Sequence, residues 1–314
     1  MEEVKTKLLN YVNPETKKQI SKSSAEKVYL IKYKILRKNL DPDAVNPEFL
    51  LDFDKTMKFV NEKYQNIQTR KSVFTSILAV LNSHGLDSKK YKDEQTKLLI
   101  DIEKNVDKHK KTEKQNENWT SLENLRSVIP YYEKLINDPK LESQEQQYEL
   151  LKKWIVAFLY VGDDDNPPFR LNYSVDIIEK KDYDYDSTNN YLVLNKGVPE
   201  IFSWGEHKNS NKKGTLRVRI GKKLKEALKT WLQHNKSSKY LLLNDIGGKM
   251  SSTSLGVFIS KVFEPTGKHV TLNLIRHIYI TSTFDVDYET SRKKTKIARA
   301  MGHNVQTQEN YHLT

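Results

Sequence analysis

Three residues near the end of the chain could together attack a phosphodiester. Arg276 lies in the run Leu-Asn-Leu-Ile-Arg-His, His303 follows Met301-Gly302, and Tyr311 comes last. An arginine and a histidine can hold and polarise a phosphate, and a tyrosine hydroxyl can act as the nucleophile. This set of residues suits the cutting and rejoining of DNA without a metal ion or ATP.

An arginine in the middle of the chain occupies a stiffened position. Arg170 follows the diproline Pro167-Pro168, and proline restricts the backbone so that the arginine is expected at a fixed junction between a loop and a strand. A lone arginine is usually a surface salt-bridge partner. Arg170 therefore gains interest only together with the residues around it.

A basic segment begins at Lys208. Lys208–Gly214 lies between two strand-like runs, which predicts a hairpin tip. From Lys208 to Lys229 there are nine basic residues and one acidic residue, Glu226. A lysine at the tip could donate a proton to a leaving oxygen. Simple contact with phosphates explains Lys212 and Lys213 equally well.

The sequence offers no pattern for a metal or a cofactor. It contains no cysteine, no HExxH helix, no calcium-binding EF-hand loop and no phosphate-binding P-loop. The acidic run Asp163-Asp164-Asp165 is interpreted as a solvated loop. The alternative, half of a two-metal nuclease site, is disfavoured because no second carboxylate cluster matches it. We expect neither a metal ion nor a cofactor.

Helical spacing dominates the first third of the chain. Apolar stripes predict helices around Val28, Ile31 and Ile35, then from Leu50 to Tyr64, and a third from about Thr69. In the third, the residues expected to face inward are Val73, Phe74, Ile77, Val80 and Leu81, and His84-Gly85 is expected to end it. Exposed basic residues such as Arg70 and Lys71 would let this region grip DNA.

The pattern changes after a polar stretch. Residues 111–118 carry no apolar side chain and are expected to link a helical domain, 1–110, to a second domain, 119–314. In the second domain, short alternating runs near 173–177, 191–194, 201–204 and 216–220 predict a small antiparallel sheet among helices. The expected fold class is α+β and mostly helical.

Composition favours a polyanionic partner. The formal net charge is +12, and basic proteins gain affinity for nucleic acid by releasing condensed counterions. Charge alone leaves open a basic protein with no such partner. No run approaches the roughly 20 apolar residues of a membrane span. The polar start, Met1-Glu2-Glu3, is unlike a signal peptide, so we expect an intracellular protein that is not secreted.

Taken in order, these residues resemble the signature of the tyrosine recombinases, the site-specific integrase family, which reads Arg, Lys, His/Lys-x-x-Arg, His/Trp, Tyr. The diproline before Arg170, with Tyr173 after it, is similar to a branch found in large DNA viruses, virophages and eukaryotic mobile elements. The resemblance implies these roles: Arg170 and Arg276 as catalytic arginines, Lys208 as the hairpin lysine, His303 in the His/Trp position and Tyr311 as the nucleophile.

The family resemblance also implies a reaction and an assembly. The two arginines would clamp one scissile phosphate while Tyr311 attacks it, giving a 3′-phosphotyrosyl link and a free 5′-hydroxyl. Lys208 would protonate the leaving oxygen. A homotetramer would act on two double-stranded DNA sites, with an N-terminal core-binding domain and a C-terminal catalytic domain. Residues expected to contact DNA are Lys212, Lys213, Arg217, Arg70 and Lys71.

One position departs from the family pattern and keeps alternatives open. Asn273 stands three residues before Arg276, where the family has His or Lys. Asparagine can hydrogen-bond a phosphate oxygen but cannot exchange a proton near pH 7. The alternatives are an enzyme similar to type IB topoisomerases and a DNA-binding protein of recombinase descent that no longer cuts.

Overall fold

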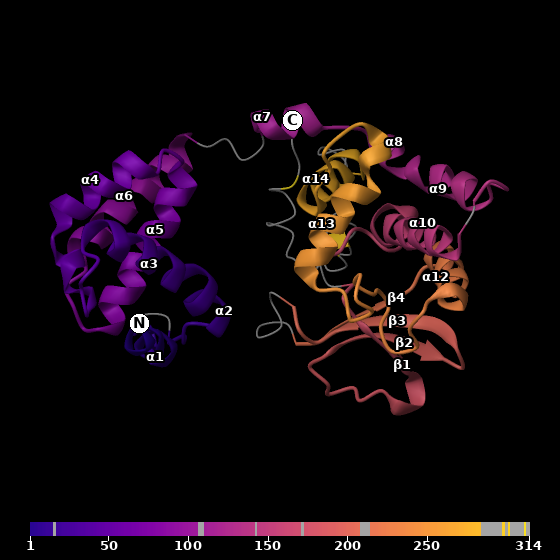
Figure 1. The fold of residues 1–314 in the computed structure, drawn as a ribbon, viewed down its shortest axis with the longest axis horizontal. Coiled ribbons are helices and arrows are strands. Elements are labelled where there is room, and N and C mark those ends of the chain that lie inside the picture. Colours follow the sequence, from indigo (N-terminus) through magenta and orange to yellow (C-terminus); the bar gives the residue numbers. More distant parts are fainter. Residues whose placement is uncertain are drawn as a thin grey trace. The chain divides into compact units, whose positions relative to one another are not determined.

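The computed structural model describes residues 1–14, 17–105, 110–141, 143–170, 173–207, 214–283, 297–298, 301 and 311. The chain divides into two compact units, Met1–Asp107 and Lys108–Thr314, hereafter unit 1 and unit 2 (Figure 1).

The described part of unit 1 is helical. Its elements are α1 (Glu2–Asn10), α2 (Lys22–Ser24), the π-helical turn η1 (Ala25–Tyr29), α3 (Leu30–Leu40), the 3₁₀ turn η2 (Pro47–Leu51), α4 (Phe53–Lys63), α5 (Ile67–Ser83) and α6 (Lys89–Asn105). Helix α5 shares the core with α1, α3 and α6.

Helix α5 confirms the clearest helical prediction in unit 1. The five residues expected to face inward, from Val73 to Leu81, are all buried. The helix starts at Ile67, slightly earlier than expected, because the side-chain oxygen of Asn66 accepts hydrogen bonds from the backbone N–H groups of Gln68 and Thr69. It ends at Ser83 with His84 as its C-cap, and Gly85 follows with a positive φ of 68°.

The prediction for the α3 region chose the wrong face. Val28 and Ile31 are 36% and 48% exposed, whereas Leu30, Tyr33 and Leu36 are buried. Both sets recur at helical spacing, so the pattern alone does not choose between them. The buried set contains Tyr33, whose ring lies 5.8 Å from that of Phe49. This set has the larger apolar area of the two, and it is the set that packs into the core.

Unit 2 mixes helices with one sheet. Its helices and turns are α7 (Glu113–Asn118), α8 (Leu122–Arg126), α9 (Val128–Ile136), α10 (Gln144–Ala157), the π-helical turn η3 (Phe158–Gly162), η4 (Lys180–Asp182), α12 (Lys222–His234), α13 (Ser252–Val262), η5 (Glu264–Thr266) and α14 (Leu272–Thr283). Helix α7 thus lies in the segment that the sequence predicts to be a linker. A capping box formed by Thr112 and Gln115 begins this helix.

The sheet of unit 2 has the strand order β1 (Asp176–Glu179), β2 (Asn190–Asn195), β3 (Val198–Trp204), β4 (Leu216–Arg219). The mostly helical α+β fold is confirmed, but the sheet is mixed rather than antiparallel throughout, because β1 runs parallel to β2. The connection between these strands crosses back over the sheet instead of forming a hairpin. Tyr183 in that connection is buried, with its hydroxyl 2.7 Å from that of Ser203 on β3.

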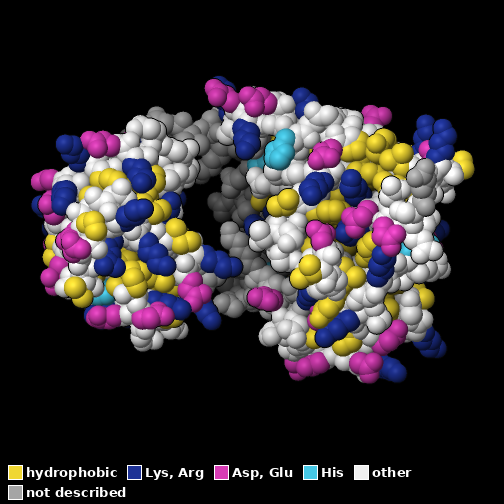
Figure 2. Space-filling model, viewed as in Figure 1, with side chains coloured by type: hydrophobic (Ala, Val, Ile, Leu, Met, Phe, Trp, Pro, Cys, Tyr) yellow, Lys and Arg dark blue, Asp and Glu magenta, His cyan; other side chains and the backbone are white. Residues whose placement is uncertain are grey.

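The surface is charged with both signs. Lys and Arg side chains are spread over the face of each unit seen in Figure 2, with Asp and Glu among them. Within the described ranges, the structure has no helix of the length and apolar character that crossing a membrane requires.

Candidate active site

Helix α14 brings two of the sequence-predicted residues together. Arg276 lies in its middle and is only 2% exposed. One terminal nitrogen, Nη1, donates a hydrogen bond of 2.8 Å to the Tyr311 hydroxyl, and Nη2 donates one of 3.2 Å to the Met301 carbonyl. The guanidinium carbon lies 4.5 Å from the centre of the Tyr311 ring. Arg276 therefore contacts Tyr311 in two ways, through a hydrogen bond to the hydroxyl and through a cation–π contact with the ring.

The buried surroundings of Arg276 destabilise the positive charge of its guanidinium. Burial lowers the pKa of its guanidinium to about 10; the Tyr311 hydroxyl opposes that shift, and the charge of Arg170 adds to it. The group is still protonated at pH 7. Its Nε is buried and has no hydrogen-bond partner among the described residues. A buried donor without a partner marks a place where an acceptor would be bound favourably.

Arg170 lies in the same locality. Its charge is close enough to lower the pKa of Arg276, and its own Nε is likewise buried without a partner in the part of the chain that the structure describes. Two like charges repel, so their approach favours an anion that both can contact. Arg170 and Arg276 are 106 positions apart in sequence, and the fold brings them together.

The loop before Arg170 is held by hydrogen bonds to the start of α12. Asp163 is buried, and its carboxylate accepts from the backbone N–H of Leu224 at 3.0 Å. The Asn166 side chain accepts from the N–H of Gly221 at 2.6 Å and donates to the Arg219 carbonyl at 3.2 Å. A Cβ at residue 221 would lie 2.4 Å from the Asp163 carboxylate, so this close approach requires glycine.

The interpretation of the acidic run as a solvated loop is wrong for its first residue. Asp163 is a structural cap of α12, whereas Asp164 and Asp165 are exposed. Asp164 forms an ion pair with Arg126. No group of three or more His, Asp or Glu able to hold a metal ion occurs among the described residues.

An aromatic stack fixes the residue just before Arg170. Phe169 is buried, and its ring lies parallel to that of Trp204 on β3 with 4.0 Å between their centres. Pro167 and Pro168 are buried as well. The residues before Arg170 are thus held by ring packing and hydrogen bonds. The predicted junction between loop and strand does not lie at Arg170, because β1 begins at Asp176.

His277 is a residue of this site that the sequence did not single out. Its Nδ1 lies 3.0 Å from the backbone carbonyl of Tyr311, and the two rings are 4.7 Å apart. Burial lowers the pKa of the imidazole, with the Tyr311 carbonyl opposing and Arg276 adding to the shift. At pH 7 the ring is therefore neutral, and its Nδ1 carries the hydrogen that the carbonyl accepts. Adjacent helical residues point in directions about 100° apart, so spacing gave no signal for this contact.

Tyr160 is a second residue that the sequence missed as part of the site. It is fully buried on η3, and its hydroxyl has no hydrogen-bond partner within the described residues. Burial raises the pKa of this phenol well above its ordinary value, and the nearby charge of Arg276 opposes the rise. Tyr160 therefore stays a neutral phenol near Arg276.

The remaining predicted residues lie apart from this contact or outside the described part of the chain. Asn273 is exposed in the first turn of α14. Arg217 lies on β4, where its Nε donates to the Tyr183 hydroxyl at 2.9 Å and its guanidinium bonds the Tyr185 carbonyl. Arg70 and Lys71 are half-buried on α5 of unit 1. The residues outside the described part are Lys208, Lys212, Lys213 and His303.

Comparison with known proteins finds similarity among solved structures alone. No protein-family model matches the chain, and no curated protein does. Among solved structures, one described as "Crystal structure of XerA recombinase" aligns with 100% of this chain and 94% of its own, at 13% sequence identity and a TM-score of 0.38.

Proposed function

We propose that this chain cuts and rejoins DNA by the chemistry of a tyrosine recombinase, with Tyr311 as the nucleophile. The observation that carries the proposal is the 2.8 Å hydrogen bond from the buried Arg276 to the Tyr311 hydroxyl. An arginine that binds both a phosphate and the attacking oxygen places the two reactants within reach of each other. The reaction needs no metal ion and no ATP in this scheme.

In the proposed reaction the phosphate binds where Arg170 and Arg276 have unused donors. Both guanidinium groups have a buried Nε without a partner among the described residues, and non-bridging phosphate oxygens are the acceptors that such forks prefer. Negative charge grows on those oxygens in the transition state. Because the donors are already in place in a buried site, they stabilise that charge without reorganisation.

The chemical step exchanges one phosphate ester for another. The Tyr311 oxygen bonds to phosphorus, its proton leaves, and the bond from phosphorus to the 5′-oxygen breaks. Lys208 is proposed to protonate the leaving oxygen, and His303 to assist proton transfer at Tyr311. The 5′-hydroxyl of a partner strand then reverses the step. Asn273 would contribute a hydrogen bond to the phosphate, since an amide does not exchange protons near pH 7.

The wider assembly follows from the same proposal. The net charge of +12 suits a double-stranded DNA partner, with Arg70 and Lys71 in unit 1, and Lys212, Lys213 and Arg217 in unit 2, contacting phosphates. Strand exchange between two DNA sites would need a homotetramer, because each chain supplies one nucleophile.

A trapping assay tests the proposal. The chain is incubated with nicked duplexes tiled over the DNA that flanks its gene. Cleavage near the nick releases the short downstream fragment that carries the free 5′-hydroxyl, and its loss leaves any 3′-phosphotyrosyl adduct trapped. We expect a species that survives denaturing electrophoresis and is absent with Tyr311→Phe. Tyr185→Phe is the matched control, because Tyr185 is 52% exposed on the sheet side of unit 2 and should leave the adduct unchanged.

Other outcomes of the same assay select the alternatives. An adduct accompanied by relaxation of supercoiled DNA, without strand exchange, would indicate an enzyme similar to type IB topoisomerases. Binding of the duplexes with no adduct on any of them would refute the proposal and favour a DNA-binding protein that does not cut.

A further inference from the structure

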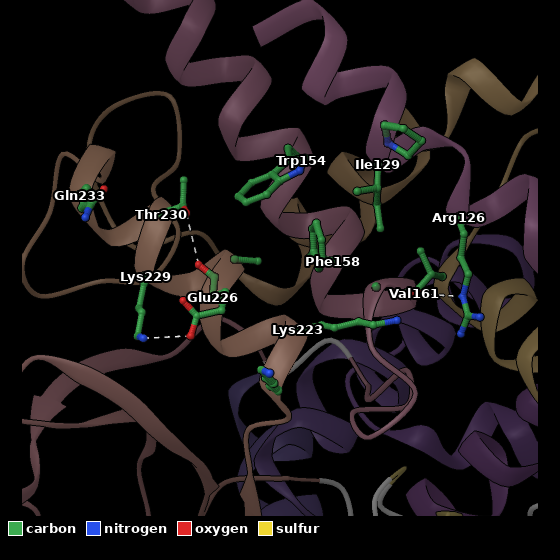
Figure 3. A pocket seen from close by; sticks show the side chains of 14 residues that line it. Arg126, Ile129, Trp154, Phe158, Val161, Lys223, Glu226, Lys229, Thr230 and Gln233 are labelled. Atoms are coloured by element: carbon green, nitrogen blue, oxygen red, sulfur yellow. Dashed lines mark hydrogen bonds and ion pairs between the residues drawn. The ribbon is translucent and has the colours of Figure 1, made fainter. Parts of the chain in front are cut away.

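Unit 2 contains a groove away from the candidate active site, with a volume of about 900 Å³. It is bordered by the start of α9, by α10 with η3, and by α12 (Figure 3). We call it the α10–α12 groove. None of Arg170, Arg276, His277 and Tyr311 lines it.

Both long walls of the groove are helical stripes. On one wall Trp154, Phe158 and Val161 follow one another at intervals of four and three residues. On the other, Lys223, Ala227 and Thr230 repeat the same intervals along α12. Such stripes are the surfaces between which the side chains of a third helix pack. The shape of the groove therefore fits a helix.

The floor of the groove is apolar. Its apolar lining comes from Trp154, Phe158 and Val161 together with Ile129 of α9 (Figure 3). Trp154 is oriented by a 3.1 Å hydrogen bond from its ring nitrogen to the Glu133 carboxylate. A rigid aromatic surface of this kind binds leucine-sized side chains at little entropic cost.

One end of the groove is positively charged. Lys222 and Lys223 have no acidic partner among the described residues, and in Figure 3 Lys223 extends from α12 toward Val161. The other charged side chains at the rim are already paired: Lys229 with Glu226 at 2.9 Å, and Arg126 with Asp164. The uncompensated charge of the rim is therefore that of the two lysines.

We infer that the α10–α12 groove binds an amphipathic helix of a partner protein, with apolar residues every third or fourth position and acidic residues beside them. The apolar floor argues against DNA, whose exposed backbone would leave Trp154 and Phe158 unused. Charge complementarity at Lys222 and Lys223 selects an acidic partner and its orientation in the groove.

Selection from a helical peptide library tests the inference. The full chain carrying Tyr311→Phe is the bait, so the result does not depend on DNA cleavage. The library displays 18-residue helices with random residues on one face, and it is depleted first on the same chain carrying Thr230→Trp. Thr230 is exposed and lines the groove, so the new indole obstructs the groove without entering the core.

The expected winners carry apolar anchors at four- and three-residue intervals and an excess of Asp and Glu. Their binding, followed by fluorescence polarisation, should weaken about tenfold with Lys222→Glu and Lys223→Glu combined. It should be unchanged with Lys225→Glu, which lies on the same helix but does not line the groove. Melting curves of each variant confirm that it is folded.

Four outcomes would overturn the inference. The first is a library that shows no enrichment over the Thr230→Trp chain, and the second is a set of winners without acidic residues. The third is self-association of the chain that Thr230→Trp abolishes, which would assign the groove to a second copy. If Lys222→Glu and Lys223→Glu instead weaken DNA retention while no peptide is selected, the lysines are phosphate contacts and the groove has no helical partner.

Discussion

Replacing Arg276 with methionine should make unit 2 more stable while it abolishes DNA cleavage. Methionine has a similar length and no charge, so it can occupy the same buried space on α14. The substitution removes a cation that the fold holds at a cost, and it removes the group that the proposed reaction needs. Active-site residues commonly oppose stability in this way.

The magnitude follows from the surroundings of the guanidinium. A pKa lowered from 12.5 to about 10 corresponds to roughly 3 kcal/mol against the charged form in the folded chain. The two hydrogen bonds that Arg276 donates, to Tyr311 and Met301, return about 1 kcal/mol each. Their loss therefore offsets about 2 kcal/mol of the gain. The net effect is a stabilisation of about 1 kcal/mol, or about 2–4 °C in the melting temperature of a unit of this size.

Differential scanning calorimetry of the full chain measures this effect, and the trapping assay on the same samples should find no adduct. The matched control is Arg217→Met. Arg217 is exposed on β4 and bonds Tyr183 and Tyr185, so its removal brings no relief from burial and should leave stability unchanged or lower. A melting temperature that falls with Arg276→Met would show that the arginine is a net structural support, and the reasoning would be wrong.

Three further predictions concern the same site. Sulfate should stabilise the natural chain, by about 1 kcal/mol at five times its dissociation constant, and it should not stabilise the Arg276→Met variant; equal stabilisation of both would show that the anion binds elsewhere. His277→Phe keeps the ring against Tyr311 but leaves its carbonyl without a donor, so adduct formation should slow about tenfold or more with partial recovery in His277→Asn, and an unchanged rate would contradict a positioning role. Because burial lowers the pKa of His277 below 6.5, the unfolded chain takes up the proton more readily; stability is complete above pH 6.5 and is lost as the pH falls through the lowered folded-state value. Melting curves between pH 7 and 5 should therefore have a shallower slope in His277→Phe, and identical slopes would refute this reasoning.

The elements of this chain could be predicted where the apolar pattern has one solution. Helix α5 has a single strong stripe, and its buried residues are those expected. In α3 two stripes compete, and the choice between them depends on Phe49, which comes from another segment. The parallel pairing of β1 with β2 depends in the same way on where Tyr183 packs. Contacts between segments are what a pattern along the chain does not contain.

The residues of the candidate site likewise fall into those that the sequence predicted and those that only the fold brings together. The order of residues predicted Arg276 and Tyr311 as site residues, and in the fold Nη1 of Arg276 lies 2.8 Å from the Tyr311 hydroxyl. The sequence did not indicate His277 or Tyr160, which reach the site only through the fold. His277 contacts the backbone carbonyl of Tyr311, and Tyr160 is buried near Arg276. Asp163 looked solvated because its partner, the start of α12, lies about 60 residues along the chain. The functions of Lys208, Asn273 and His303 remain predictions from the sequence.

Tyr311 is held at two points that can part separately. Arg276 holds the hydroxyl and His277 holds the main-chain carbonyl. The side chain could therefore leave the arginine while the peptide stays anchored, and the tyrosine would turn about a fixed pivot. In the proposed reaction, a DNA strand joined to that oxygen would move only along the arc that one side chain can sweep. The severed end would then wait at a set distance from α14, which is the condition for rejoining it without releasing it.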